Sequence, residues 1–366
     1  MLETSAETAE VRSGEALNSE RLLNYLESSG FGGPIEVRQF PAGSSNLTYL
    51  IVLDQGQFVL RRPPFGNTVK TAHDMRREFD VLSKLSAVYL PAPKPIIYCE
   101  DESVIGSEFY LMERRHGIVV RGGLSAEQIP NDDAAAAVER FETDRSFQMD
   151  LCKGFIENMV KLHALDPEGS GLGSLGKPEG YNRRQVEGWT KRYFAATTHE
   201  WLELDEVIAW LNDKIPAESG ASIIHNDYKF DNVMLDPNDL TRVTAVLDWE
   251  MVTIGDPLMD LGTTLAYWMS RETGEEMLSM PFNPRVLMVN VSRKQLADMY
   301  AEASGRELPD LLFYYVFGTF KIAVIAQQIY ARYVKGFTKD ERFAKFDRFV
   351  AALGKIGAGA LSRGAI

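Results

Sequence analysis

Hydrophobic residues follow two different patterns along the chain. Up to about Glu113 they form short runs typical of β-strands, at residues 49–52, 58–60 and 109–113, separated by turn-forming residues. Beyond that point they recur mostly at helical spacing, as over residues 293–303 and 342–353. The pattern therefore predicts an α+β fold with a small N-terminal lobe built on an antiparallel sheet and a larger, mainly helical C-terminal lobe.

Three stretches refine this division of the chain. Residues 73–85 carry apolar side chains at helical spacing and predict a helix within the N-terminal lobe. Residues 311–330 are very apolar, but polar side chains interrupt them and their length is marginal for a membrane span, so we expect a core helix. Residues 1–20 are polar and acidic, without the apolar core of a secretion signal, and predict a disordered tail. The expected segments are 1–20 (tail), 21–113 (N-terminal lobe) and 114–366 (C-terminal lobe).

The clearest chemical pattern lies near residue 230. His225, Asp227 and Asn232 stand in the order H-x-D-x-x-x-x-N. This is the spacing of a kinase catalytic loop, in which the aspartate accepts or orients the substrate hydroxyl and the asparagine binds metal. We expect His225 to support the loop structurally, because Asp227 is the better base. The spacing predicts phosphoryl transfer, with Asp227 as the catalytic carboxylate.

The sequence around this loop predicts a hairpin. Apolar residues at 233–235 and 243–247 flank the turn-forming residues 236–239, and Asp248 follows directly. We expect two short antiparallel strands that bring Asp248 toward Asn232. Mg²⁺ prefers oxygen ligands and needs only one or two carboxylates beside phosphate and water, so Asn232 and Asp248 are the candidate metal ligands.

The acidic residues and Lys229 each have an alternative interpretation. The acidic residues could be ordinary turn residues around a hairpin, but the two motifs occur together and in the right order, which favours phosphoryl transfer. Lys229 could lie near the transferred phosphate and assist catalysis, or it could be a solvent-facing loop lysine.

The N-terminal lobe offers candidates for a nucleotide site. A turn between two strand-like runs could present backbone N–H groups to phosphates, although it could equally be an ordinary hairpin turn. Farther along, residues 109–113 resemble a hinge segment that pairs with adenine through its main chain, at Met112 and Glu113. The candidate phosphate-binding residues of the turn are Gly43, Ser44, Ser45 and Asn46.

The strand over residues 58–62 and the following helix predict an ion pair. Alternation along the strand puts Val59 and Arg61 on one face, where Val59 would lie against adenine and Arg61 would meet the phosphates. Glu78 could face the sheet and pair with Arg61, or it could be an exposed residue paired with Arg76 or Arg77.

These motifs resemble the aminoglycoside phosphotransferase and choline kinase superfamily, enzymes of protein-kinase-like fold that act on small molecules. The resemblance implies ATP and Mg²⁺ as cofactors, Asp227 as catalytic residue, and Asn232 and Asp248 as metal ligands. It also implies that Asp256 and Asp260, in and just after Gly-Asp-Pro, brace the site. Arg61 departs from the pattern, because kinases usually have lysine there and a guanidinium is not a simple replacement.

One branch of this family occurs fused ahead of acyl-CoA dehydrogenases. The chain resembles that branch at residues 162–167 and 171–173 and at the residues that follow them up to Trp189. The similarity runs from about residue 38 to 270. The branch implies a hydroxyacyl or other small hydroxyl acceptor. Its proposed acceptor-binding residues lie in the helical insertion before the catalytic loop and are Arg184, Gln185 and Trp189.

Two other functions stay open. An aminoglycoside phosphotransferase would need clustered carboxylates for several ammonium groups, and Glu139, Glu142 and Asp144 could form such a rim or simply a solvated helix face. A nucleotide-binding module without catalysis is the other alternative, although it would not need Asp227, Asn232 and Asp248 together.

Composition narrows the range of partners. The chain has 366 residues, 45% of them hydrophobic and 25% charged, which suffices for a normal core. Its formal charge of −13 opposes nonspecific binding to nucleic acid or an anionic membrane. The two cysteines have neither zinc-site nor disulfide spacing, so we expect a cytoplasmic location. The C-terminal helices could wall the acceptor site or form a homodimer surface.

Overall fold

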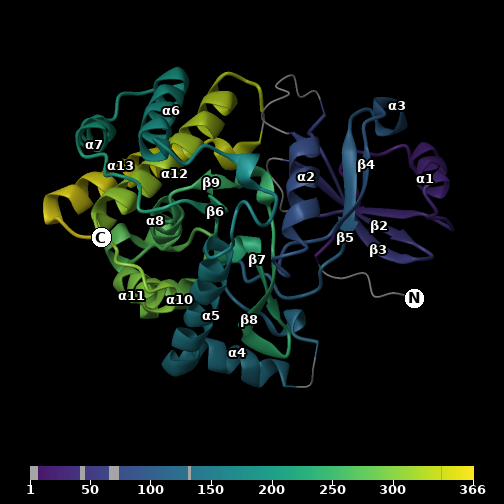
Figure 1. The fold of residues 1–366 in the computed structure, drawn as a ribbon, viewed down its shortest axis with the longest axis horizontal. Helices are drawn as coiled ribbons and strands as arrows, with labels where there is room; N and C mark the ends of the chain where they lie inside the picture. Colours follow the sequence, from purple (N-terminus) through teal and green to yellow (C-terminus); the bar gives the residue numbers. More distant parts are fainter. Residues whose placement is uncertain (1–6, 42–45, 66–73, 131–132, 339) are drawn as a thin grey trace. The chain divides into compact units, whose positions relative to one another are not determined.

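The computed structural model describes residues 7–41, 46–65, 74–130, 133–338 and 340–366. It divides into two compact units, Met1–His116 and Gly117–Ile366. The first is built around one sheet and the second is mainly helical (Figure 1). The predicted α+β fold is present, and the division falls close to the boundary that we expected after Glu113.

Unit 1 contains an antiparallel five-stranded sheet in the order β1-β2-β3-β5-β4. Helix α2 packs against β4 and β5, and Asp74 caps its N-terminus by accepting a hydrogen bond from Arg77 N–H. Leu22 and Leu26 of α1 join the core of the sheet. The elements are α1 (Ser19–Ser28), β1 (Glu36–Gln39), β2 (Leu47–Leu53), β3 (Gly56–Arg62), α2 (Met75–Leu85), β4 (Pro95–Cys99), α3 (Glu102–Ile105) and β5 (Phe109–Glu113).

The N-terminal residues from 7 onward belong to this unit. Ala9 forms a β-bridge with Gln39, and the hydroxyl of Tyr49 donates to the carbonyl of Glu15 at 2.8 Å. Val11 and Leu17 pack on the hydrophobic core. The prediction of a disordered tail is therefore wrong for residues 7–20, because their few apolar side chains find a partner surface that composition alone does not reveal. Residues 1–6 lie outside the described residues.

Unit 2 is organised around the long helix α12, which packs against α8, α13 and α6. Figure 1 shows these helices grouped beside the short strands that carry the catalytic loop. The α-helices and β-strands of this unit are α4 (Ala134–Thr143), α5 (Arg145–His163), α6 (Tyr181–Ala196), α7 (Leu202–Asp213), β6 (Ser222–Ile224), β7 (Val233–Asp236), β8 (Asp239–Val246), β9 (Thr253–Gly255), α8 (Pro257–Tyr267), α9 (Glu275–Leu278), α10 (Arg285–Asn290), α11 (Arg293–Ser304), α12 (Leu311–Val334) and α13 (Phe346–Arg363).

Helix α12 is long and apolar enough to cross a membrane by length and composition, and among the described residues it alone meets that test. However, 78% of its most apolar window is buried inside the structure. This burial is the pattern of a core helix, as the sequence predicted.

The predicted hairpin is present as β7 and β8. These strands pair in antiparallel register, with Val233 opposite Val246 and Asp236 opposite Asp239. A second small sheet pairs β6 with β9 and places Ile223 opposite Ile254. The catalytic loop therefore leaves β6, forms one 3₁₀ turn over Phe230–Asn232 and enters the hairpin.

Candidate active site

The backbone of the catalytic loop is held by one buried carboxylate. Asp260, in the first turn of α8, accepts the backbone N–H groups of His225 and Asn226, each at 2.7 Å. The same carboxylate accepts a hydrogen bond from His163 Nε2 at 3.1 Å. Burial by itself raises the pKa of Asp260, but His163 and the loop N–H groups outweigh this effect and lower it. Asp260 is therefore ionised and fixes the start of the loop.

Asp256 has a corresponding role at the N-terminus of the same helix. It caps α8 by accepting the N–H of Leu258 at 2.9 Å. It also accepts hydrogen bonds from Asn182, Ser219 and Tyr314, each at 2.9 Å. This fully buried carboxylate connects α8 to α6, α12 and the segment before β6.

His225 connects the two motifs through its ring. Its Nε2–H donates to the carbonyl of Leu247 at 2.8 Å, and its Nδ1 accepts the backbone N–H of Asp227 at 3.2 Å. Burial lowers the pKa of His225, which suits a neutral ring with one donor and one acceptor nitrogen. The side chain is a structural link between the loop and the residue before Asp248.

The carboxylate of Asp227 lies among three polar side chains. Oδ2 accepts hydrogen bonds from Lys229 Nζ at 2.5 Å and from Asn232 Nδ2 at 2.7 Å, and Tyr267 also donates to the carboxylate. Burial alone raises the pKa of Asp227, but the charge and hydrogen bond of Lys229 outweigh it, so the pKa falls below its ordinary value. Asp227 is therefore an ionised and oriented acceptor.

Lys229 is not the solvent-facing lysine that the sequence left open. It is 7% exposed, and its ammonium lies 5.1 Å from the centre of the Tyr267 ring. Burial tends to lower its pKa, yet the neighbouring Asp227 raises it above the ordinary value. The site thus holds a charged lysine directly beside the candidate base.

Asn232 and Asp248 are brought together by the hairpin. The carbonyl of Asn232 accepts the N–H of Leu247 at 2.8 Å, which places Asp248 one residue beyond this contact. Asp248 has φ 64° and ψ 68°, a left-handed conformation that is costly for a residue with a Cβ. The side-chain nitrogen of Asn232 donates to Asp227, so the side-chain oxygen of Asn232 is the atom that can bind a cation. One carboxylate and one amide oxygen fit Mg²⁺ bound together with phosphates.

Unit 1 contains the expected ion pair between β3 and α2. Arg61 Nε lies 3.3 Å from Glu78 Oε1, and both side chains are buried. Glu78 therefore faces the sheet and is not the exposed residue of the alternative interpretation. Val59 is buried on the same strand, opposite Met112 of β5. The pair supplies a rigidly held cation in this unit.

The other nucleotide-site candidates in unit 1 have mixed outcomes. Gly43, Ser44 and Ser45 lie outside the described residues, and Asn46 is buried directly before β2. The backbone N–H of Glu113 donates to the carbonyl of Lys94 at 2.9 Å. A hinge contact at Glu113 would therefore have to use its carbonyl group and not its N–H.

The three acceptor candidates on α6 do not act as one group. The guanidinium of Arg184 donates to the carbonyls of Lys177 and Glu179, so it secures the turn before its own helix. Trp189 is buried, and its Nε1–H donates to Gln185 at 3.2 Å. The branch resemblance made these residues candidates together, but the exposed Arg184 binds local carbonyls while Trp189 lies near Lys321 of α12.

Several residues in contact with the loop were not identified from the sequence. Asn283 accepts the N–H of Phe230 at 3.0 Å, and the hydroxyl of Thr264 donates to the carbonyl of Tyr228. Tyr267 and Lys321 approach Asp227 and Asn226 from α8 and α12. The signal in the sequence was Lys321, a cation in the middle of a mostly apolar helix.

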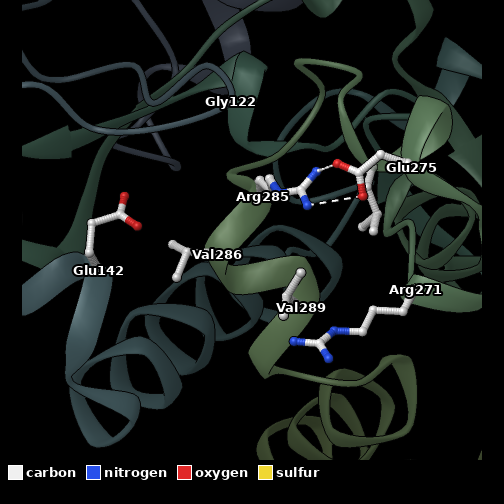
Figure 2. A pocket seen from close by; sticks show the side chains of 8 residues that line it. Gly122, Glu142, Arg271, Glu275, Arg285, Val286 and Val289 are labelled. Atoms are coloured by element: carbon white, nitrogen blue, oxygen red, sulfur yellow. Dashed lines mark hydrogen bonds and ion pairs between the residues drawn. The ribbon is translucent and has the colours of Figure 1, made fainter.

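A pocket opens beside segments that anchor the loop. Its volume is about 640 Å³, and Figure 2 shows Arg285 paired with Glu275 across it. Arg121, next to the lining residue Gly122, pairs with Asp231 of the loop at 2.5 Å. The lining combines charged with apolar side chains: Gly122, Glu142, Arg271, Glu275, Leu278, Arg285, Val286 and Val289.

The fold and the catalytic loop together define a small-molecule phosphotransferase with a bilobal, kinase-like architecture. Residues 36–280 match the sequence profile of the phosphotransferase enzyme family. The chain belongs to this family.

Curated relatives are longer than this chain. Acyl-CoA dehydrogenase family member 11 of Gallus gallus is 32% identical over 363 residues, which cover 96% of this chain and 44% of that protein. The human protein of the same name is 33% identical, again over 44% of its length. The chain therefore spans less than half the length of the curated relatives it matches.

Solved structures show the same fold. A protein of Ralstonia eutropha JMP134 assigned as an aminoglycoside phosphotransferase has TM-score 0.76 and 29% identity, covering 95% of this chain and 99% of that one. Choline kinase of Cryptosporidium parvum Iowa II has TM-score 0.62, 13% identity and coverage of 95% and 97%. An aminoglycoside phosphotransferase crystallised with ADP and hygromycin B has TM-score 0.57, 16% identity and coverage of 93% and 98%.

Proposed function

We propose that this chain moves the γ-phosphoryl group of ATP, bound with Mg²⁺, to a hydroxyl of a small hydroxyacyl or other non-aminoglycoside acceptor. One observation carries the proposal. The Asp227 carboxylate is ionised and held by Lys229, Asn232 and Tyr267, and Asp248 follows two residues after the β7–β8 hairpin. This arrangement supplies a proton acceptor, a cation and oxygen ligands for metal.

The chemistry follows from these positions. The acceptor hydroxyl oxygen forms a bond to the γ-phosphorus as the bond from that phosphorus to the bridging oxygen of ADP breaks. Asp227 orients the hydroxyl and takes its proton, and ADP leaves with the bridging oxygen. Lys229 stabilises the negative charge near the transferred group. When bound by Asn232 and Asp248, Mg²⁺ would offset charge on the phosphates.

Unit 1 contributes nucleotide affinity in this proposal. Arg61 would bind phosphate oxygens, and Glu78 would hold the guanidinium in position. The solved relative that contains ADP supports nucleotide use within this fold. Because Arg61 stands where lysine is usual in kinases, its contact would spread over two oxygens rather than one.

The acceptor class rests on two further observations. The curated relatives carry acyl-CoA dehydrogenase names, which favours an acyl compound. Arg271 lines a pocket with valine and leucine walls, which suits an acidic group on an apolar chain, whereas Arg285 of the same pocket is already paired with Glu275. Glu142 and Glu275 line the same pocket, so an aminoglycoside remains the second candidate acceptor. We place the reaction in the cytoplasm, where the buried Cys99 and Cys152 would stay reduced.

The test is a panel of acceptors with Mg-ATP and the purified chain. Hydroxy acids, hydroxyacyl thioesters, amino alcohols and aminoglycosides are compared by ADP release and by detection of the phosphorylated product. We expect turnover with a hydroxyacyl compound. Turnover confined to aminoglycosides would overturn the acceptor class. Saturable ATP binding without turnover on any acceptor would favour a nucleotide-binding module instead.

A further inference from the structure

Helix α12 carries a buried lysine that reaches the catalytic loop. Lys321 is 2% exposed, and its Nζ donates to the backbone carbonyl of Asn226 at 2.6 Å. The side-chain oxygen of Asn226 lies 3.4 Å from the same ammonium. Burying an ammonium is costly unless it is well paired, so this contact calls for a function beyond packing.

Asn226 is the residue immediately before Asp227, and its conformation is strained. Its φ of 68° lies in the left-handed region. Its backbone N–H donates to Asp260, its side-chain nitrogen donates to the carbonyl of Met251 at 3.0 Å, and Tyr181 donates to its side-chain oxygen at 3.4 Å. Lys321 completes this set by holding the carbonyl. A strained residue persists when its surroundings determine its conformation in this way.

The approach of α12 to the loop depends on two glycines. A Cβ at Gly318 would lie 2.5 Å from the carbonyl oxygen of Gly262 in α8, and a Cβ at Gly262 would lie 2.2 Å from the carbonyl oxygen of Tyr314. The two helix backbones therefore pack closely one turn before Lys321. This contact brings an ammonium to the loop across 95 positions of sequence.

We propose that Lys321 is a positioning residue for phosphoryl transfer, which fixes the direction of Asp227 by holding the carbonyl of Asn226. The inference rests on the proposed function of Asp227 and deepens it. Misplacing a catalytic carboxylate by about 1 Å lowers the rate roughly 100-fold. Lys321 therefore affects the rate without touching the substrate.

Charged groups around Lys321 determine when it can act. Burial is the main reason why the pKa of Lys321 falls to about 8. The negative charges of Asp227 and Asp260 raise this pKa, and the positive charges of Lys229 and Arg192 lower it further. The ring of Trp189 on α6 lies 5.8 Å from the ammonium. The pKa values of Lys229 and Tyr181 are raised, so of these three groups Lys321 is the one that loses its proton near pH 8. Above that pH the neutral amine should hold Asn226 less firmly.

The test compares Lys321→Met with Gln327→Met. Gln327 is also buried on α12, but its side chain binds the carbonyl of Ala196 and the hydroxyl of Thr198 and not the loop. Hydrogen exchange of the peptide over residues 223–230 is measured first, since it needs no substrate. We expect at least tenfold faster exchange at Asn226 and Asp227 in Lys321→Met and no change in Gln327→Met. Unchanged exchange in a folded Lys321→Met protein would overturn the proposal.

Kinetics then separate positioning from a purely structural role. In Lys321→Met we expect kcat to fall about 100-fold while KM for ATP stays within about twofold. If Lys321→Met only reduces the fraction of molecules that are folded, and kcat per folded molecule is normal, the proposal is overturned. If the wild-type chain turns over no acceptor, the proposed function fails, while the exchange experiment still decides the role of Lys321.

The pH profile gives a measurement on the unsubstituted chain. We expect kcat of the wild type to decline as the pH rises through about 8, and Lys321→Arg to move this decline upward, because a guanidinium stays charged. A flat wild-type profile between about pH 7 and about pH 9.5, which brackets that titration, would contradict the proposal even if every Lys321 variant failed to fold.

Discussion

Lys229 and Asp227 form an ion pair of 2.5 Å within the catalytic loop, and both side chains are largely shielded from water. Each partner shifts the pKa of the other toward the charged form, against the effect of burial. The loop therefore presents a carboxylate and an ammonium together, two residues apart in sequence. A phosphoryl-transfer site requires both signs of charge at one place, because a proton leaves the acceptor while negative charge builds on phosphate oxygens.

Replacing Lys229 with methionine should lower kcat by about 100- to 1,000-fold, because in the proposed mechanism its ammonium stabilises the negative charge that develops on the phosphate. The pKa of Asp227 should rise at the same time, since Lys229 is what lowers it. The acidic limb of the pH–rate profile would then move to higher pH. Steady-state kinetics from about pH 4.5 to about pH 8 measure both effects. Lys294→Met, at an exposed lysine of α11, is the control. An unmoved acidic limb would argue against this coupling.

Replacing Asp260 with asparagine should destabilise the protein by about 3 kcal/mol, because a buried carboxylate that accepts two backbone N–H groups and a histidine loses its charge. Urea unfolding measures the change. Asp298→Asn, which breaks an exposed ion pair with Lys294, should have little effect. Equal losses of unfolding free energy in the two variants would show that the buried network around the loop stabilises the protein no more than an exposed ion pair does.

Replacing Glu78 with glutamine should weaken nucleotide binding about tenfold, because Arg61 would lose the carboxylate that holds it. Arg61→Ala should weaken binding by a similar factor, and the double variant should lose less than the product of the two, as expected for residues in contact. Equilibrium ATP binding measures all three proteins. Arg76→Ala, at an exposed residue of the same helix, serves as the comparison. Strictly multiplicative losses would contradict a shared role.

The free energy of unfolding should fall as the pH drops below about 6.5, the ordinary pKa of histidine. Burial lowers the pKa of His225 in the folded chain, so the unfolded chain binds the proton at higher pH and is favoured by acid. A pKa that differs by about one between the folded and unfolded chains corresponds to about 1.4 kcal/mol. Asp227 and Asp260 have lowered pKa values and contribute only at much lower pH. Urea unfolding at about pH 7.5 and about pH 5.5, on either side of the ordinary histidine pKa, measures the slope.

His116 has a lowered pKa as well, through burial and the charge of Arg114, so it contributes with the same sign. His116→Gln separates the two contributions. A substantial fall in stability should remain in that variant and should be smaller in His225→Asn. If the pH dependence disappears in His116→Gln, His225 does not contribute to it.

Local patterns predicted the elements of the site that are close in sequence. The order His225, Asp227, Asn232 and the turn before β8 were enough to predict the loop, the hairpin and the approach of Asp248, because each depends on neighbours within a few residues. The pairing of Arg61 with Glu78 followed from strand alternation and helical spacing.

Other features of the site depend on contacts between distant elements. Lys321 meets Asn226 only because α12 and α8 pack at Gly318 and Gly262, a contact that neither helix shows alone. The branch resemblance made Arg184 a candidate acceptor ligand, yet its guanidinium binds the nearby carbonyls of Lys177 and Glu179. For the same reason, the apolar residues before α1 gave no sign of the core that they cover.

In the proposed function, Asp227 serves as the catalytic carboxylate of a small-molecule kinase. The most direct measurement is the acceptor-dependent release of ADP by the wild-type chain and by Asp227→Asn, both shown to be folded and to bind ATP. We expect turnover by the wild type and a loss of roughly 100- to 10,000-fold in kcat for the variant, with ATP affinity little changed. Turnover by a folded Asp227→Asn protein at the wild-type rate would show that Asp227 is not the catalytic carboxylate.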